Sequence, residues 1–202
     1  TYGIQGGTGS GSVSKVGTYG TLEVDAASGA FTFTPNAAAI NQRVANATSQ
    51  FTVTVTDGTA TTTALYIVDV VGAIDPPVLA TPTAIALIDT SDNDTFATVT
   101  GTLSATDRDA GQTMAYGIDG VTSATSTVSQ TGSYGTLTVT KATGAYSFAP
   151  NAAAINALTA DASASFTVTA SDGTDSDSAT LAIEITGATD APVLATPTGP
   201  TY

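Results

Sequence analysis

Two aspartates, one residue apart, are the side chains in this sequence best suited to chemistry. Asp107 and Asp109 stand in the stretch ATDRDAGQTMAYGI, which Gly111 closes before an apolar run begins. Paired carboxylates in a bent loop can direct several oxygens at one centre, and calcium takes six to eight oxygen ligands. The stretch is not an EF-hand loop, because the Gly and the terminal Glu of that motif are absent. The pair therefore indicates either a calcium site or a solvated turn.

The composition excludes several classes of function. The chain has 17 acidic and 4 basic residues, a formal net charge of −13, and neither Cys nor His. Nucleic-acid binding needs clustered Lys and Arg, so we expect none. Thiol and histidine chemistry are excluded, and we expect the chain not to be an enzyme. No apolar run approaches the roughly 18 residues of a membrane helix, so we expect no membrane insertion. The net negative charge of the chain favours the binding of divalent cations.

An internal repeat organises the chain. Residues 17–83 match residues 132–198 without a gap, and more than half of the paired positions are identical. This spacing predicts a repeat of about 115 residues. Residues 80–195 form one complete repeat, 1–79 form a partial repeat that lacks its first thirty or so positions, and 196–202 start a further one. We expect a segment of a longer tandem array, with strand exchange between chains as the alternative.

Apolar and polar residues alternate within each repeat. One polar residue separates Leu22 from Val24, and single Thr residues separate Phe51, Val53 and Val55. This alternation predicts half-buried antiparallel strands. The stretch PNAAAIN at 35–41 and 150–156 breaks the alternation and predicts a short helical turn. Several short strands without a long helix are typical of an all-β sandwich.

The last strand of the first copy predicts an apolar surface. Alternation directs Tyr66, Val68 and Val70 toward the core, and it directs Leu65 and Ile67 outward. The second copy has Thr and Ala at the two outward positions. We expect an extra apolar patch on the first copy, which is either covered by a neighbour or simply exposed.

Several stretches resemble a known family. They are IDTSDNDTFATVTGTLSATDRDAG, YGTLTVTKATGAYSFAPNAAAI, FTVTASDGT and ITGATDAPV. Together they resemble the VCBS repeats of bacterial surface proteins, a cadherin-like group, and ATDRDAGQTMAYGI is similar to the Asp-x-Asp-x-Gly segment of cadherin repeats. The resemblance covers the complete repeat and most of the partial one. It implies tandem Ig-like or cadherin-like β-sandwiches, the first lacking its N-terminal strands, with calcium held at the junctions between repeats.

The resemblance also implies a set of metal ligands. Asp107 and Asp109 match the paired ligands, Asp172 in SDG matches the aspartate after the penultimate strand, and Asp75 in GAIDPPV takes the linker position. These four side chains are expected to converge at the junction between repeats. The Leu-Asp-Arg-Glu motif of cadherins is absent, so we expect one ion or a water-completed site.

Four further aspartates are weaker candidates. Asp92 and Asp94 can act with Asp190 toward a following repeat, and Asp57 is the first-copy counterpart of Asp172. The competing interpretation is structural. An Asp before a turn Gly commonly accepts hydrogen bonds from its own backbone, which would explain Asp57 and Asp172 without a metal, and Asp92 and Asp94 can be solvated turn residues.

The residues and the resemblance together predict a structural role. We expect an extension repeat of a large secreted bacterial adhesin, surface-layer or filament protein at the cell surface, stiffened by calcium (Ca2+). Its partners would be neighbouring repeats and like chains in a filament or layer. The alternative is a calcium-dependent polysaccharide-binding module in cell adhesion or a biofilm matrix. In that case Tyr2, Tyr19, Tyr116 and Tyr134 would stack on sugars, although Tyr19 and Tyr134 also fit core positions.

Overall fold

Antiparallel β-strands dominate the chain, in agreement with the alternation of apolar and polar residues. The computed structural model describes residues 1–190, 192 and 199. The predicted start of a further repeat at 196–202 lies, apart from residue 199, outside the described residues. The strands divide between two compact units, each with two main sheets around its own core. The predicted all-β sandwich fold is therefore confirmed.

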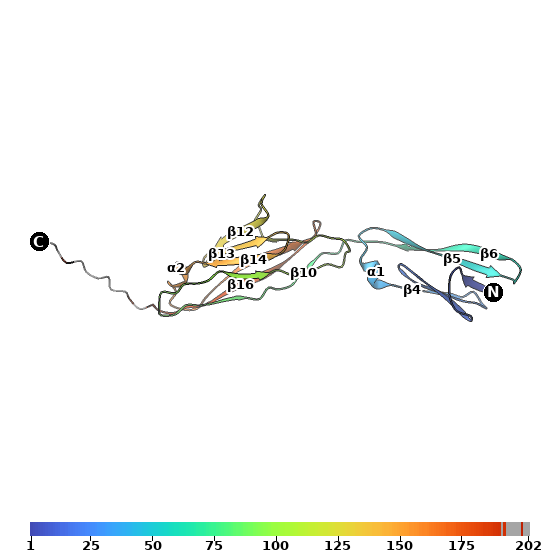
Figure 1. The fold of residues 1–202 in the computed structure, drawn as a ribbon, viewed down its shortest axis with the longest axis horizontal. Coiled ribbons are helices and arrows are strands. Elements are labelled where there is room, and N and C mark those ends of the chain that lie inside the picture. The colour runs from blue at the N-terminus through green and yellow to red at the C-terminus, as the bar shows by residue number, and fades with distance from the viewer. Residues whose placement is uncertain (191, 193–198, 200–202) are drawn as a thin grey trace. The chain divides into compact units, whose positions relative to one another are not determined.

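Unit 1 consists of residues 1–75 and the segment Asp107–Gln112. Its strands are β1 (Tyr2–Ile4), β2 (Ser12–Gly17), β3 (Gly20–Asp25), β4 (Phe31–Pro35), β5 (Ala47–Thr56) and β6 (Thr61–Val70). One sheet has the order β1-β5-β6 and the other has the order β2-β3-β4, with every pair antiparallel. Figure 1 shows β5 beside β6. A short helix, α1 (Ala37–Asn41), joins the two sheets.

Unit 2 consists of Pro76–Thr106 and the chain from Thr113 onward. Its elements are β7 (Val78–Leu79), β8 (Ile85–Ile88), β9 (Val99–Thr102), β10 (Ala105–Thr106), β11 (Ala115–Ile118), β12 (Thr127–Gly132), β13 (Gly135–Thr140), β14 (Ala145–Pro150), α2 (Ala152–Ile155), β15 (Ala162–Ser171) and β16 (Ser176–Thr186). The main sheets have the orders β11-β15-β16-β8 and β12-β13-β14-β9, and β7 pairs with β10. Figure 1 shows β12, β13 and β14 side by side. Strand β8 runs parallel to β16.

The repeat relates the strands of unit 1 to those of unit 2. Strands β1 to β6 correspond in order to β11 to β16, and helix α1 corresponds to α2. Strands β7 to β10 have no counterpart in residues 1–75. The first unit therefore lacks its N-terminal strands, as predicted. The repeat boundary expected after residue 79 concerns sequence periodicity and stays a prediction, whereas packing divides the chain after Asp75.

The two helices are single turns fixed by asparagine caps. The side chain of Asn36 accepts a hydrogen bond from the backbone N–H of Ala39 at 3.3 Å, and Asn151 accepts one from Ala154 at the same distance. The helical turn predicted from PNAAAIN is confirmed in both copies. Within the described part of the chain, no helix has the length and apolarity needed to cross a membrane.

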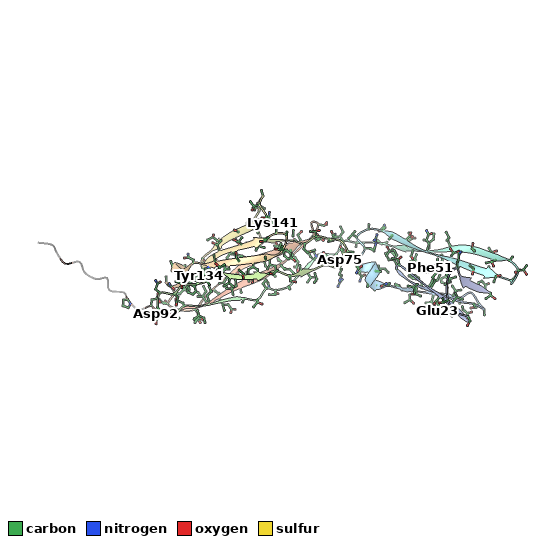
Figure 2. All side chains as sticks on the ribbon, viewed as in Figure 1. Glu23, Phe51, Asp75, Asp92, Tyr134 and Lys141 are labelled. Atoms are coloured by element: carbon green, nitrogen blue, oxygen red, sulfur yellow. The ribbon has the colours of Figure 1, made fainter. Side chains whose placement is uncertain are left out.

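Each unit has its own core. In unit 2, the rings of Phe148 and Phe166 meet edge to face across the two sheets, with centroids 6.0 Å apart. The buried core of unit 1 is smaller and consists of Ile4, Leu22, Val24 and Phe51. Figure 2 labels Phe51 among these strands.

The outer face of β6 is apolar, as the alternation predicts. Leu65 is 61% exposed and Ile67 is 51% exposed, while Val70 is buried and Tyr66 and Val68 pack against the core. This arrangement confirms the predicted inward and outward sets.

One glycine in each unit lets an aromatic side chain approach the β-hairpin. Gly144 has φ +69°, and a Cβ there would lie 2.7 Å from the Leu103 carbonyl oxygen and 3.1 Å from the ring of Tyr116. Gly29 has φ +75°, and a Cβ there would lie 2.9 Å from the ring of Tyr2. Both positions require glycine for backbone conformation and for space.

Candidate metal sites

Three of the predicted aspartates come together in unit 1. The backbone N–H of Asp75 donates to Oδ2 of Asp109 at 2.8 Å, and the N–H of Asp109 donates to Oδ1 of Asp107 at 2.8 Å. The next residue, Ala110, donates its N–H to the carbonyl oxygen of Gln42 at 3.3 Å. These hydrogen bonds hold the acidic segment 107–112 against the end of unit 1.

Two carboxylate oxygens at this place have no hydrogen-bond partner. Asp109 is only 7% exposed and its Oδ1 is buried without a partner, as is Oδ2 of Asp107. A buried, ionised carboxylate is costly unless a hydrogen-bond donor or a cation compensates it. Hard carboxylate oxygens are the ligands that calcium prefers, so the donor set fits this ion.

A basic side chain lies near Asp75. Arg43 and Asp75 line the same small cavity of about 120 Å³, together with Ile40 and Ala73. The guanidinium of Arg43 lies 6.0 Å from the ring centroid of Tyr19, and its Nε is buried without a hydrogen-bond partner. Arg43 therefore places a positive charge at the cavity that Asp75 lines, which makes Asp107 and Asp109 the stronger metal candidates.

Asp172 forms the turn that links β15 to β16 in unit 2. Its Oδ1 accepts the backbone N–H groups of Thr174 at 2.6 Å and Asp175 at 2.7 Å. These two bonds, that of Asp175 first, lower the pKa of the Asp172 carboxyl below its ordinary value of 3.8. Asp57 forms the same two-bond turn in unit 1. The turn interpretation is therefore confirmed for both residues.

The two aspartates differ in their second oxygen. Asp57 is exposed, whereas Asp172 is only 8% exposed and its Oδ2 is buried without a hydrogen-bond partner. Asp172 thus keeps one oxygen for a further ligand after the turn has formed. It belongs to unit 2, whereas Asp107 and Asp109 belong to unit 1, so the convergence of all four predicted ligands stays a prediction.

A second acidic cluster lies in unit 2 where β8 ends. Asp89 is 3% exposed; its Oδ2 accepts the N–H of Ala188 at 3.1 Å, while its Oδ1 has no partner. Oδ1 of Asp190 is also buried without a partner. Burial raises the pKa of Asp190, and the negative charges of Asp89, Asp94 and Asp92, in that order, raise it further. Three neighbouring carboxylates therefore repel the charged form of Asp190.

The sequence candidates in this cluster are not equally buried. Asp92 is exposed at one end of unit 2, as Figure 2 shows. Asp94 is half-buried and accepts the N–H of Thr90 at 2.5 Å. Asp89, which our sequence reasoning missed, is the most deeply buried member. Its signal was present, because the alternation that buries Ile85 and Leu87 continues to residue 89.

The buried carboxylates of Asp89 and Asp172 lie at opposite ends of one sheet of unit 2. Ile88, the last residue of β8, pairs with Thr186 at the end of β16. Ser171, the last residue of β15, pairs with Ser176 at the start of β16. Asp89 and Asp172 follow these strand ends, so unit 2 presents a buried carboxylate at each end of the same sheet.

Asp177 is a second residue missed at the sequence level. Its Oδ2 accepts the N–H of Leu79 in β7 at 2.8 Å, and its Oδ1 accepts the N–H of Ser178 at 2.8 Å. The bond from Leu79, followed by that from Ser178, lowers the pKa of Asp177. Asp177 thus holds the strand that opens unit 2 against its sheet.

None of these clusters is a complete metal cage. Across residues 1–190, 192 and 199, no three acidic side chains are placed at the spacing of metal ligands. Backbone carbonyl groups and water, which calcium accepts readily, would have to supply the remaining oxygens.

The tyrosines considered for sugar stacking mostly pack inward. Tyr19 is buried, and Tyr116 and Tyr134 pack against the core of unit 2, where the Tyr116 hydroxyl accepts the N–H of Ala105 at 3.3 Å. Tyr2 is partly exposed. The arrangement favours the core interpretation of Tyr19 and Tyr134.

Several solved structures of cadherin extracellular regions are similar to the chain. A protocadherin GammaB4 extracellular domain has a TM-score of 0.41 and 16% identity, over 88% of this chain and 27% of that one. Drosophila N-cadherin EC1-3 has a TM-score of 0.36 and 15% identity, over 89% and 55%. Protocadherin Gamma B7 domains 1-4 have a TM-score of 0.41 and 15% identity, over 90% and 42%.

The chain spans between 27% and 55% of the length of these structures. At TM-scores below 0.5 the similarities carry no argument about this chain, and its fold follows from its own strand pairing. No protein-family model matches the chain, and no curated protein sequence matches it.

Proposed function

We propose that the chain is a structural extension segment of a large secreted bacterial surface protein, an adhesin, surface layer or filament, built from cadherin-like repeats of the VCBS type. Its role is to provide length and spacing outside the cell, and calcium stiffens the junctions between repeats. The observation that carries this proposal is the set of buried carboxylate oxygens without partners, on Asp107 and Asp109 in unit 1 and on Asp89, Asp172 and Asp190 in unit 2.

Electrostatics supports calcium over a protein partner for these oxygens. The chain has four basic residues against 17 acidic ones, so it has few cations of its own with which to compensate buried carboxylates. Calcium would cross-bridge carboxylates that otherwise repel, and it accepts irregular sets of oxygen ligands. The ligands in unit 1 would be Asp107 and Asp109, with Asp75 as a further predicted contributor, and Asp172 would offer its unpartnered oxygen in unit 2. Those in unit 2 would be Asp89 and Asp190, with Asp94 and Asp92.

Calorimetric titration and thermal melting of the full chain test this proposal. We expect calcium to bind and to raise the melting temperature Tm, EGTA to reverse the change, and magnesium at equal concentration to have a smaller effect. The variant Asp109→Asn should lose at least about tenfold in calcium affinity, because its orphaned oxygen no longer carries charge.

A matched control is Asp69→Asn, which makes the same change at an exposed position of β6 and should titrate like the parent chain. If calcium changed neither the melting curve nor the heat of mixing, the metal proposal would be refuted. A glycan array with and without calcium addresses the polysaccharide alternative, which gains no support from the inward packing of Tyr19 and Tyr116.

A further inference from the structure

One position that follows the short helix differs in charge between the two units. It is occupied by Arg43 in unit 1 and by Leu158 in unit 2, and the aspartates that stand 32 residues further on, Asp75 and Asp190, also correspond in the repeat. The backbone is the same in both copies, because each residue donates its N–H to the carbonyl oxygen three residues earlier, at 3.0 Å for Arg43 and at 2.9 Å for Leu158. The two copies therefore differ here in the side chain.

The Arg43 side chain carries a charge that its surroundings compensate only in part. Its guanidinium lies 6.0 Å from the ring centroid of Tyr19, and its Nε is buried without a hydrogen-bond partner. It lines a small cavity together with Asp75. Leu158, in contrast, packs against the apolar core of unit 2. A buried guanidinium is costly unless negative charge or hydrogen-bond acceptors compensate it, and a leucine at the same position has no such requirement.

The acidic segment Asp107–Gln112 is bound beside this cavity. The carbonyl oxygen of the residue before Arg43 accepts an N–H from the segment at 3.3 Å, and the N–H of Asp75 donates to Oδ2 of Asp109 at 2.8 Å. The segment contains the two buried carboxylate oxygens of unit 1 that have no partner, on Asp107 and Asp109. One incompletely compensated cation thus stands at the same end of unit 1 as two incompletely compensated anions.

The corresponding end of unit 2 has only negative charges of this kind. The carboxylates of Asp89, Asp94 and Asp92 lie close enough to Asp190 to disfavour its ionised form. Leu158 adds no charge to compensate them. An ion from solution is therefore the available source of positive charge for this cluster.

We propose that Arg43 is an internal cation that takes over part of the charge compensation at the end of unit 1 and so weakens calcium binding there. The position that holds Arg43 in one copy and Leu158 in the other thereby sets how strongly each end depends on calcium. Arginine supplies a fixed positive charge that repels the incoming ion, and leucine leaves the carboxylates to the ion alone. This inference rests on the proposed calcium-binding function and names the residue that regulates it.

A reciprocal exchange in the full chain tests the inference. Calcium is titrated into the parent chain, Arg43→Leu and Leu158→Arg, and the backbone amide NMR signals of Asp75 and Ala110 report unit 1, while that of Ala188 reports unit 2. Each end then gives its own Kd. We expect Arg43→Leu to tighten calcium binding in unit 1 at least about threefold, because a unit charge near the site no longer opposes the entry of a divalent ion. The Kd at Ala188 should stay unchanged in this variant, and Leu158→Arg should weaken it by a similar factor.

Two control variants separate charge from packing. Arg43→Lys keeps the charge and should bind calcium in unit 1 within about twofold of the parent chain. Lys15→Leu removes the same charge from β2 and should leave the Kd of unit 1 unchanged. If Arg43 served only to pack on Tyr19, Arg43→Leu would change the Tm equally with and without calcium and would leave the Kd unchanged, which would overturn the inference. Arg43→Leu alone is decisive, since the repeat already accommodates leucine at this position in unit 2.

The outcomes distinguish this inference from the proposed function. Equal calcium affinity of unit 1 in the parent chain and in Arg43→Leu would overturn the inference and leave the proposed function standing. A response of unit 1 to calcium only in Arg43→Leu would confirm the inference in its strongest form, in which the guanidinium replaces the ion. If unit 1 responded in neither chain while Ala188 responded in both, the inference would fail and calcium binding would belong to unit 2. If no signal of either unit responded in any variant, the inference and the proposed function would fail together.

Discussion

The substitution Asp89→Asn is expected to raise the melting temperature of unit 2 in the absence of calcium and to lower it, relative to the parent chain, when calcium is present. The asparagine Oδ1 can still accept the N–H of Ala188, so the anchor that Oδ2 of Asp89 provides at 3.1 Å is kept. What the variant loses is one negative charge beside Asp190, Asp94 and Asp92. Without calcium, removal of this charge relieves repulsion in a buried site, so the variant should melt above the parent chain.

With calcium the order should reverse. A ligand present at 100 times its Kd stabilises the folded state by about 2.7 kcal/mol, which corresponds to a rise in Tm of about 10 °C for a unit of this size. The parent chain should show this gain, while Asp89→Asn, with a weakened site, should show only a small part of it. The parent chain should therefore melt above the variant in calcium and below it in EGTA.

Scanning calorimetry with EGTA and with excess calcium measures this reversal. The matched control is Glu184→Gln, which removes a charge from an exposed position of β16 and should shift both conditions equally. A purely structural role for Asp89 predicts that Asp89→Asn destabilises unit 2 by the same amount with and without calcium. That result would refute the assignment of Asp89 as a metal ligand.

Two further predictions concern packing and pH. Leu22 and Leu137 are both fully buried, but Leu22 also lines a cavity of about 330 Å³ in unit 1. Leu137→Ala should cost about 2–5 kcal/mol, and Leu22→Ala should cost less, because the side chains that line the cavity can relax into the vacated space. Urea unfolding of each variant checks this order. The hydroxyl and then the N–H of Ser28, at 2.6 and 2.7 Å, lower the pKa of Asp25 below 3.8, so its contribution to the stability of unit 1 is present above that pH and is lost as the pH falls through the lowered pKa. Asp25→Asn should flatten the acid limb of the stability curve of unit 1, and an unchanged limb would contradict this reasoning.

Features that depend on neighbours in sequence were predictable. The cap of α1 needs only Asn36 and the residues that follow it, and the turn at Asp172 needs only the Gly and two N–H groups beyond it. The inward phase of β6 follows from strict alternation. Asp107 and Asp109 were recognisable as a pair because their loop is closed locally.

Features that depend on distant strands were not predictable in the same way. The role of Asp177 is not visible in its local sequence, because nothing near it reveals that the N–H of Leu79, 98 residues earlier, needs an acceptor. The alternation signals the burial of Asp89, but its hydrogen-bond donor, the N–H of Ala188, lies 99 residues away. Likewise, nothing in the local sequence shows that Arg43 and Asp75, 32 residues apart, line one cavity.

Asp57 and Asp172 show that one sequence motif forms the same turn in both copies, while the second carboxylate oxygen of each residue has different surroundings. Both stand in the same Asp-Gly-Thr stretch, and both accept two backbone N–H groups in the same turn. Only Asp172 has its remaining oxygen buried and without a partner. A short turn therefore fixes one oxygen in every copy, and the surroundings of that copy decide whether the other oxygen needs a cation. In a chain this acidic, the dependence on calcium should follow the positions of the few buried carboxylates at strand ends, and the larger number of exposed ones should contribute only a salt-screened background.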